Sequence, residues 1–307
     1  MASATKQRNA TPSDGSGGWE LSRAGGLELL KAPSLARLDW LTHGFSTRRR
    51  GLSELNGKHV LNLGFTPWDS RARVVANRKR FFQAIGAGNM PFVALSQIHS
   101  DIAHSIDKSQ LRANTAPQGD ALFTREPGIL LAVQTADCVP ILLADTQRRA
   151  VAAIHSGWRG TLGRVALKTL GRMRMEFGTR PEDVTVALGP SIGRCCYEVG
   201  PDVARQFHAQ FARASEWFDG PFPALASGEN DPNWLPWLTM RPPGHALRSP
   251  RVNLDLIAAN RAILLDAGVP AHQISASELC TACRNDIFFS NRRERSTGRM
   301  MSAIGLR

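Results

Sequence analysis

The sequence predicts a single domain of mixed β-sheets covered by helices, in the α/β or α+β class, and three observations support this. Short apolar and β-branched runs alternate irregularly with longer amphipathic runs, so strands and helices are mixed along the chain. Apolar residues make up 42% of the 307 residues, which is enough for a sizeable core. The irregular internal stretch at about 219–250 is dense in Pro and Gly and reads as a long surface loop rather than a domain boundary.

The N-terminal residues 1–25 are rich in Ser, Gly, Thr and Ala, which predicts a flexible tail before a single catalytic domain at 26–307. Apolar residues at helical spacing predict helices over 71–85, 161–177 and 255–266. Gly178 is a stop signal for the second of these helices, and Gly268 with Pro270 ends the third.

Four β-rich runs are expected to be strands, at residues 130–134, 139–144, 151–154 and 184–188. The most apolar run, 129–144, is interrupted by Gln134, Asp137 and Pro140, so it reads as buried strands and not as a membrane span. The N-terminus lacks the apolar segment of a secretory signal, which makes the cytoplasm the expected location. Five cysteines in such a chain are expected to be thiols or metal ligands rather than a disulfide framework.

The formal net charge of +12 gathers partly at residues 48–50 and 292–299. A nucleic-acid surface is one interpretation, and a solvated basic face or arginines that serve a small anionic substrate is the other. No module of aromatic residues interleaved with basic ones accompanies the charge, and the chain has one tyrosine. The sequence therefore favours a solvated basic face or arginines for a small anion over nucleic acid.

A metal site is the main chemical prediction from the residues. Cys138 and His155 lie at the ends of predicted buried strands, and His99 follows the apolar run 92–95. Adjacent strands would bring Cys138 and His155 together. Two imidazoles and a thiolate leave one position of a tetrahedral zinc ion open, which is the pattern of a catalytic site. Asp120 or Asp137 is expected to orient the imidazoles.

Other interpretations of these residues stay open at this point. Taken singly, Cys138 and His99 also fit an inert buried thiol and an ordinary histidine. Cys138 with His155 fits a nucleophilic thiolate and its base, as in cysteine hydrolases. The same His-Cys-His set fits copper. Gly157 and Gly160 are expected to permit a sharp turn from strand to helix beside the site.

The remaining cysteines give weaker signals. Cys280 and Cys283 form a CxxC motif without a partner pair in the sequence, so a structural turn or buried thiols are favoured over zinc. The adjacent Cys195 and Cys196 are expected in a tight loop, with at least one of them buried.

Several longer motifs occur in a fixed order and cover most of the chain. They are HGFSTR at 43–48, LNLG at 61–64, QIH at 97–99, TADCVP at 135–140, HSGWRG at 155–160, LGPSIG at 188–193, CCYEVG at 195–200, CT at 280–281 and FFS at 288–290. With these motifs the sequence resembles the purine nucleoside phosphorylase family long labelled polyphenol oxidase or multicopper laccase domain.

The resemblance implies mixed α/β layers similar to cysteine-type deamidating toxins, and a metal held by His99, Cys138 and His155. It implies phosphorolysis of adenosine, inosine and S-methyl-5′-thioadenosine, with adenosine deamination as a further activity, and a homodimer is plausible. In some bacterial members it implies editing of peptidoglycan precursors. This chain has Asn291 where the family often has tyrosine, which questions substrate stacking there, and Ser156 replaces the usual alanine.

Roles for further residues follow from the two activities. Asp120, Asp137 and His43 are candidates for proton transfer, because the usual deaminase motif is absent. The candidates for binding phosphate are Arg48, Arg159 and Arg293. Asn62 is expected either to bind ribose or base or to cap a turn. Arg49, Arg50 and Arg292 are interpreted as surface charge.

The laccase label makes its own prediction. A four-copper oxidase needs many imidazoles, including His-x-His pairs. This chain has eight histidines and none has that spacing, which disfavours such an enzyme.

Overall fold

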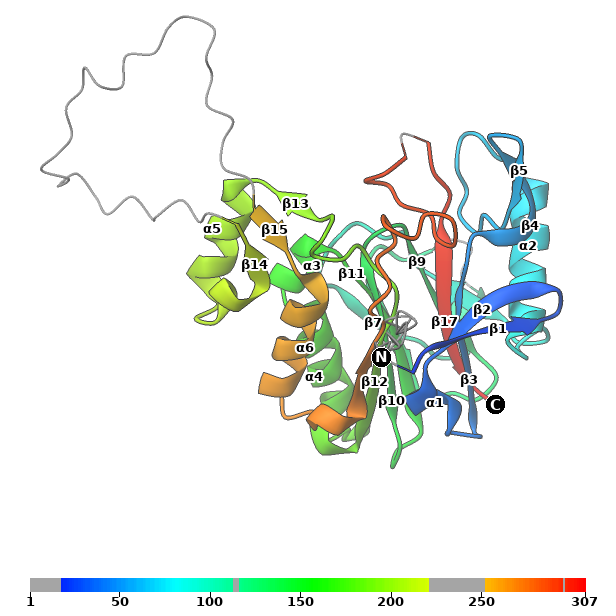
Figure 1. Cartoon of the computed structure of the whole chain (residues 1–307). Helices are drawn as coiled ribbons and strands as arrows, with labels where there is room; N and C mark the ends of the chain where they lie inside the picture. Colours follow the sequence, from blue (N-terminus) through cyan, green and yellow to red (C-terminus); the bar gives the residue numbers. More distant parts are fainter. Residues whose placement is uncertain (1–17, 113–115, 221–251, 295) are drawn as a thin grey trace, which may run out of the picture.

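The computed structural model describes residues 18–112, 116–220, 252–294 and 296–307, and it contains two six-stranded sheets (Figure 1). The first sheet has the order β1 (Glu20–Ala24), β2 (Leu27–Lys31), β3 (Leu41–Ser46), β17 (Met300–Leu306), β9 (Leu130–Thr135) and β6 (Phe92–Ala94). The second has the order β16 (Ile274–Ala276), β12 (Val184–Leu188), β10 (Val139–Asp145), β11 (Ala150–Ser156), β8 (Ala121–Thr124) and β7 (Ala103–Ser105). Both sheets are mixed, because each contains parallel and antiparallel pairs.

The described part of the chain has six helices, of which the three longest cover the outer faces of the two large sheets. The six are α1 (Pro33–Ala36), α2 (Arg71–Ala84), α3 (Trp158–Leu162), α4 (Val165–Phe177), α5 (Pro201–Gln210) and α6 (Leu256–Asp266). Helices α4 and α6 lie on one side of the molecule and α2 on the opposite side (Figure 1). Two smaller sheets complete the described fold, β4 (Arg49–Leu55) with β5 (Lys58–Val60), and β13 (Glu198–Val199) with β15 (Val252–Leu254) and β14 (Phe218–Asp219).

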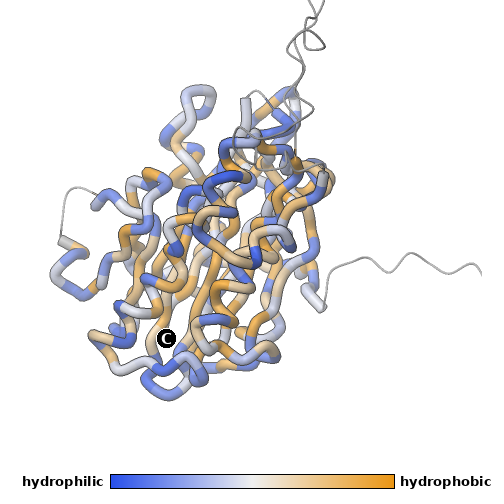
Figure 2. The backbone as a smooth tube through the Cα atoms, turned by 90° about the vertical axis from the view of Figure 1, so that its left-hand side faces the viewer, coloured by the Kyte–Doolittle hydropathy of each residue, from blue (hydrophilic) through white to orange (hydrophobic). Residues whose placement is uncertain are grey.

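The core has three parts because the strands are buried on both faces. In β10, Ile141 and Leu143 pack towards α4 and α6, whereas Leu142 and Ala144 pack between the two sheets. This alternation follows from the two-residue repeat of a strand, in which successive side chains point to opposite faces. The third part lies between α2 and the outer face of the first sheet. The tube in Figure 2 is accordingly apolar along the central strands and polar at the loops.

The strands and helices predicted from the sequence are mostly confirmed. All four predicted strands and the helices expected at 71–85 and 255–266 are present within a few residues. The helix expected over 161–177 is instead two helices, α3 and α4. Arg164 between them has a φ of 58°, a left-handed conformation that a continuous helix excludes. Gly178 ends α4 with a φ of 73°, as its position predicts.

The boundary of the predicted tail is a correction. Residues 20–24 form β1, which pairs with β2. The Trp19 side chain is 2% exposed, and its ring centre lies 4.9 Å from that of Phe45. This segment is therefore held by backbone pairing and a buried indole. Residues 1–17 of the expected tail, and 221–250 of the expected loop, lie outside the described residues. Among the helices of the described part, none combines the length and the apolar character needed to cross a bilayer. The likeness to deamidating-toxin folds stays a prediction.

Candidate functional site

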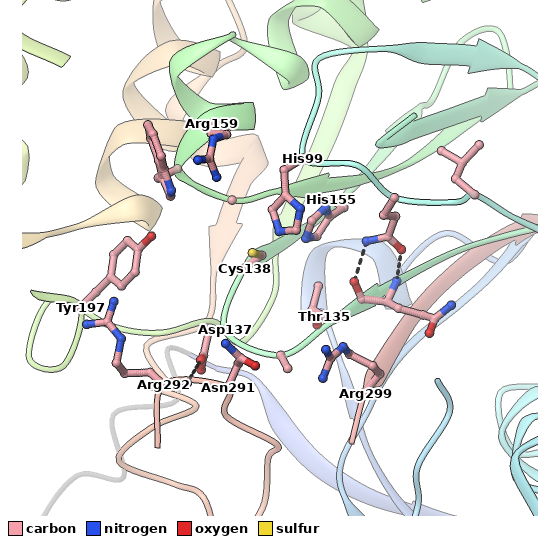
Figure 3. Close-up of a pocket in the computed structure, with 16 residues that line it drawn as sticks. His99, Thr135, Asp137, Cys138, His155, Arg159, Tyr197, Asn291, Arg292 and Arg299 are labelled. Carbon is pink, nitrogen blue, oxygen red and sulfur yellow. Dashed lines mark hydrogen bonds between the residues drawn. The ribbon is translucent and has the colours of Figure 1, made fainter. Parts of the chain in front are cut away.

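Three side chains from separate segments converge at one end of the second sheet (Figure 3). Cys138 directly precedes β10, and His155 is the second-last residue of β11. These strands are antiparallel, with Pro140 opposite His155, so the start of one lies beside the end of the other. His99 comes from the loop between β6 and β7. One ligand atom from each of the three lies within 4.8 Å of the others.

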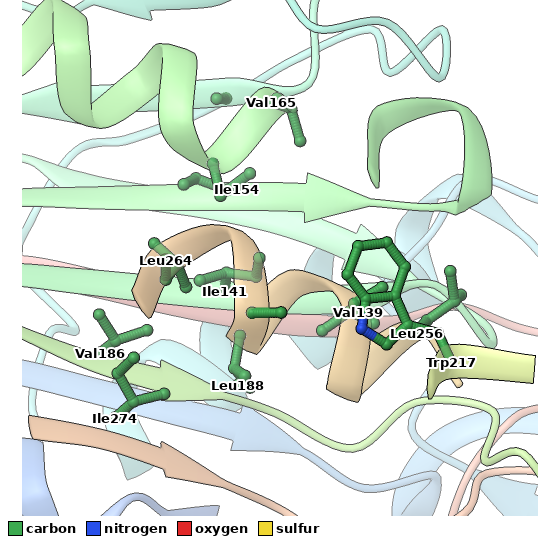
Figure 4. Packing of buried hydrophobic residues seen from close by; sticks show 14 of the residues in the cluster. Val139, Ile141, Ile154, Val165, Val186, Leu188, Trp217, Leu256, Leu264 and Ile274 are labelled. Atoms are coloured by element: carbon green, nitrogen blue, oxygen red, sulfur yellow. The ribbon is translucent and has the colours of Figure 1, made fainter. Parts of the chain in front are cut away.

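The strands that carry Cys138 and His155 are fixed by the core beneath them (Figure 4). Ile141 of β10 and Ile154 of β11 are fully buried among residues of α4 and α6. Burying a branched side chain of this kind stabilises a fold by about 2 kcal/mol. The two ligands therefore stand on rigid elements, as a preorganised site requires.

Gly157 makes the close approach of the three ligands possible. A Cβ atom at this position would lie 2.9 Å from the Cys138 sulfur and 3.3 Å from the His99 ring. The φ of Gly157 is −83°, which any residue adopts. Space beside the ligands, rather than a special turn conformation, is thus the reason for glycine here.

Asp120 holds two of the ligands in place from behind. Its side chain is 0% exposed, and one carboxylate oxygen lies 2.8 Å from His155 Nδ1. It also accepts hydrogen bonds from the backbone amides of Ile98, His99 and Ser100. These amides fix the loop in which His99 has a φ of 59°, a strained conformation for a non-glycine residue.

A second contact fixes the same loop from the first sheet. The Gln97 side chain donates to the Gln134 carbonyl at 2.8 Å and accepts from the Gln134 amide at 2.7 Å (Figure 3). The amide group thereby imitates the pairing of a neighbouring strand on β9. His99 is positioned by both sheets, although it lies in a loop and is exposed.

The three groups alter one another's ionisation. Burial acts to raise the pKa of Cys138, but hydrogen bonds with His155 and His99 outweigh it and lower the pKa to about 6. Burial acts to lower the pKa of His155, and the hydrogen bonds to Asp120 and Cys138 raise it to about 9. Burial opposes ionisation of Asp120, yet its bonds with His155 and Ser100 lower its pKa to about 2. A thiolate is therefore available at neutral pH, and Asp120 is ionised.

The donor set fits a divalent metal ion such as zinc. A thiolate and two imidazoles are ligands that zinc binds in proteins. Because the ionised Asp120 accepts from His155 Nδ1, a metal ion would bind at Nε2 of that ring, in place of the proton that bonds to Cys138. The three residues also face a cavity, which leaves room for a further ligand.

That cavity has a volume of about 500 Å³, a size typical of small-molecule sites. Three arginines line it: Arg159 after β11, Arg292 in the loop that leads to β17, and Arg299 directly before β17. Among the described residues that line it, Asp137 is the one carboxylate. The wall is thus positively charged and suits an anion.

Two aromatic rings also line the cavity. Trp158 begins α3, and the Arg159 guanidinium lies 4.4 Å from the centre of its ring. Tyr197 is the one tyrosine of the chain, and the Arg292 guanidinium lies 5.2 Å from its ring centre. Burial raises the pKa of Tyr197 to about 12, so its hydroxyl stays protonated. Although Asn291 stands where tyrosine was expected, the cavity still has aromatic faces.

The candidates for proton transfer are placed differently from one another. Asp120 lies behind His155 and is fully buried, so the structure supports an orienting role and not proton exchange with a substrate. Asp137 lines the cavity, but its two carboxylate oxygens accept from Thr281 Oγ1 at 2.6 Å and from the Arg292 amide at 2.7 Å. It does not orient an imidazole.

His43 is a correction, because it lies in β3 and does not line the cavity. Its Nε2 accepts a hydrogen bond from the Ala32 amide at 3.0 Å. Burial lowers the pKa of His43 to about 3, so the ring is neutral and belongs to the packing of the first sheet.

Three predicted substrate residues lie away from the cavity, and two of them have structural contacts. Arg48 donates to the carbonyls of Asn285 and Phe288 and pairs with Glu294 at 2.9 Å. Asn62 is fully buried and bonds to Gly64, Thr66, Asp69 and the Arg299 amide. Arg293 is exposed, and its amide donates to Ser290 Oγ. None of the three lines the cavity, whereas Arg159 does.

The sequence interpretation missed Tyr197, Arg292 and Arg299. Arg292 was interpreted as surface charge, yet it donates to the Glu198 carbonyl and lines the cavity. The available signals were the CCYEVG motif, which contains Tyr197, and the position of Arg299 directly before an apolar run.

Comparisons with known proteins identify relatives of this chain in sequence and in fold. The family model described as multi-copper polyphenol oxidoreductase laccase matches residues 42–307. A purine nucleoside phosphorylase of Deinococcus radiodurans is 38% identical over 287 residues, which cover 92% of this chain and 94% of that protein. A protein named adenosine deaminase RL5, from an unknown prokaryotic organism, is 34% identical, and the match covers 81% of this chain and 87% of that protein. The solved structure of YfiH from Bacillus licheniformis has a TM-score of 0.75 at 30% identity, covering 91% of this chain and 96% of the other.

Proposed function

The chain belongs to the multi-copper polyphenol oxidoreductase laccase family, and we propose that this member is a zinc-dependent purine nucleoside phosphorylase that also deaminates adenosine. The resemblance drawn from the sequence motifs is confirmed by the family match. The observation that carries the proposal is the convergence of His99, Cys138 and His155 at a cavity that three arginines line.

The cavity offers a place for each part of the substrates. Arg159, Arg292 and Arg299 supply planar guanidinium groups that can bind two phosphate oxygens at once. Trp158 and Tyr197 supply aromatic faces for a purine ring. The volume of about 500 Å³ accommodates a nucleoside together with phosphate. Adenosine, inosine and S-methyl-5′-thioadenosine are the proposed nucleosides.

His99, Cys138 and His155 would hold the zinc ion. When bound, such an ion supplies Lewis-acid chemistry at neutral pH. The chain's own contribution is orientation. The ionised Asp120 fixes the ring of His155 through Nδ1 and fixes the loop of His99 through the backbone. Gly157 keeps the space beside the thiolate open.

In the proposed phosphorolysis, a phosphate oxygen forms a bond to C1′ of the nucleoside while the bond from C1′ to the purine nitrogen breaks. The electron pair of that bond stays on the purine, which gains the proton that the hydrogen phosphate loses. The products are the free base and ribose 1-phosphate. The arginines would hold the phosphate against C1′ and offset the repulsion between anionic groups.

Replacing an exposed ligand tests the site without disturbing the core. Purified protein given inosine and phosphate should release hypoxanthine and ribose 1-phosphate, and His99→Ala should lower kcat/KM at least about 100-fold. His104→Ala is the matched control, because His104 lies five residues further on and outside the cavity. Normal turnover by His99→Ala would refute the proposed site.

A cysteine hydrolase that edits peptidoglycan precursors is the second candidate function. The lowered pKa of Cys138 beside His155 favours it, since a thiolate with an imidazolium partner is the arrangement of cysteine nucleophiles. This candidate requires activity that survives complete removal of metal and is lost on alkylation of Cys138. The phosphorylase proposal instead requires loss of activity on chelation, whereas alkylation of the ligand Cys138 would inactivate the protein under either proposal.

Copper in the same three ligands would make the protein a copper oxidoreductase, which is the third candidate. Adding zinc or copper back to the chelated protein separates these alternatives. Recovery of phosphorolysis with zinc supports the proposal, whereas oxidation of phenols on addition of copper supports the laccase-like activity.

A further inference from the structure

Four of the five cysteines form a second cluster, away from the cavity described above. Cys195 and Cys196 lie in the loop between β12 and β13, and Cys280 and Cys283 lie in the turns after β16. Their four sulfur atoms lie within 4.8 Å of one another. None of the four lines the arginine-rich cavity.

The backbone brings these two loops together. Ser191 and Cys280 form an isolated β-bridge, and the Thr281 amide donates to the Ser191 carbonyl at 2.9 Å. The Gly193 amide donates to the Cys280 sulfur at 3.2 Å. A Cβ atom on Gly193 would lie 3.3 Å from the Cys195 sulfur and 3.1 Å from Cys280 Cβ, so glycine leaves the space that the cluster occupies.

The sulfur separations fit a common ion better than covalent pairs. The Cys283 sulfur lies 3.5 Å from the Cys195 sulfur and 3.4 Å from the Cys196 sulfur. A disulfide requires about 2.05 Å. Sulfur atoms at about 2.3 Å from zinc lie about 3.8 Å apart at the corners of a tetrahedron. Small shifts of the side chains would therefore complete a tetrahedral site.

We propose that Cys195, Cys196, Cys280 and Cys283 bind a single structural zinc ion. Four thiolates fill a tetrahedral coordination shell, which leaves no position for water or substrate and is the pattern of structural sites. This inference does not rest on the proposed enzymatic function. It reverses the sequence interpretation of Cys280 and Cys283, because the partner pair that the CxxC motif lacked lies 84 residues or more away in the chain.

The ion would join two walls of the cavity. Tyr197 directly follows Cys196, and the segment after Cys283 leads to Arg292. Thr281, next to Cys280, donates to the carboxylate of Asp137, which is the neighbour of the ligand Cys138. Zinc in the cluster would thus fix the distance between the two segments that carry Tyr197 and Arg292.

Metal analysis in the His99→Ala background tests this site alone. That variant lacks a ligand of the cavity but keeps all four cysteines of the cluster. Purified from medium with zinc, it should retain one zinc per chain, and X-ray absorption should find four sulfur neighbours at about 2.3 Å. Absence of zinc, or nitrogen among its neighbours, would overturn the proposal.

Variants of the cluster supply the second measurement. Cys283→Ser, added to His99→Ala, should abolish the remaining zinc and lower Tm by at least about 5 °C. Ser277→Ala is the control, because it changes a small side chain in the same segment and keeps all four cysteines, so this variant should retain the zinc. If the cysteine variant does not fold, cobalt substitution of the His99→Ala protein should give the visible absorption of a tetrathiolate site.

Mass spectrometry of the unreduced His99→Ala protein tests the remaining alternative, that the four cysteines form disulfides. Intact thiols are expected after the zinc is removed. If the mass of freshly purified protein is lower by two or four hydrogens, the cysteines form disulfides and the proposal is overturned.

Discussion

Histidine, cysteine and arginine each occur in two settings in this protein, around the cavity and in the framework that supports it. By the framework we mean β3, the segment 48–62 that follows it, and the cluster of four cysteines. His155 presents a ring nitrogen towards the cavity, whereas both faces of His43 are buried in the first sheet. Arg299 lines the cavity, whereas Arg48 binds backbone carbonyls and Glu294.

The difference shows that residue type alone does not assign function. Around the cavity, three donor atoms meet where a ligand still has room, and arginines have guanidinium groups available to an anion. In the framework, residues of the same types form their hydrogen bonds with other parts of the protein, as His43 does with Ala32 and Arg48 with Glu294. Each pair of like residues therefore offers a test, in which the cavity member changes catalysis and the framework member changes stability.

Among the comparisons between cavity and framework, replacing Asp120 should have the largest effect on catalysis. Asp120→Asn weakens the bond that orients His155 and should lower kcat/KM about 100-fold, together with metal affinity. Asp145→Asn is the matched control, because Asp145 is also fully buried and accepts from backbone amides, at the opposite end of β10. Asp145→Asn should lower Tm and leave kcat/KM near the wild-type value. Equal kinetic losses in both variants would break the comparison.

Acid sensitivity should distinguish His43 from the histidines of the cavity. The folded pKa of His43 is lowered to about 3, so below about 6.5 the unfolded chain takes up a proton that the folded chain excludes. This contribution to stability is present above pH 6.5 and is lost as the pH falls towards 3. Between pH 7 and pH 5 it removes about 2 kcal/mol from the free energy of unfolding.

His43→Gln keeps an acceptor for the Ala32 amide but cannot titrate. Urea unfolding at pH 7 and pH 5 measures the decrease in the free energy of unfolding. This decrease should be smaller in the variant than in the wild type, by about 2 kcal/mol. Activity at pH 7 should be unchanged. An undiminished decrease in the variant would show that His43 is not the group responsible.

The smallest expected effect separates the two arginines. Arg299→Gln should raise KM for phosphate about tenfold, since a charged hydrogen bond to the anion is lost. Arg48→Gln should leave this KM unchanged and lower Tm, because the carbonyls of Asn285 and Phe288 lose their donor. Steady-state kinetics with phosphate as the varied substrate gives KM for both variants, and thermal unfolding gives Tm. A raised KM in Arg48→Gln alone would invert the comparison.

The sequence predicted those parts of the site that depend on regular structure. Cys138 and His155 lie at the ends of neighbouring strands with strong apolar patterns, so their proximity follows from pairing β10 with β11. His99 was identified because its motif accompanies the other two. Its position depends on Asp120 and Gln97, contacts that no local pattern indicates.

The residues that were missed or misplaced lie in irregular segments. Arg292 and Arg293 are neighbours in the sequence, but Arg292 lines the cavity and its amide donates to Asp137, whereas Arg293 does not line the cavity. The two cysteine pairs meet because a bridge joins Ser191 to Cys280. Contacts between distant loops of this kind depend on the finished fold, so sequence spacing does not reveal them.

The place of β17 in the first sheet has a consequence for biosynthesis. This strand, Met300–Leu306, lies between β3 and β9, so the first sheet stays divided until the ribosome has added these residues. Arg299 precedes it directly, and the last wall of the cavity is therefore assembled in the same late event. A nascent chain halted before residue 300 would hold His99, Cys138 and His155 but expose two apolar strand edges, so we expect it to bind chaperones before the cavity is complete.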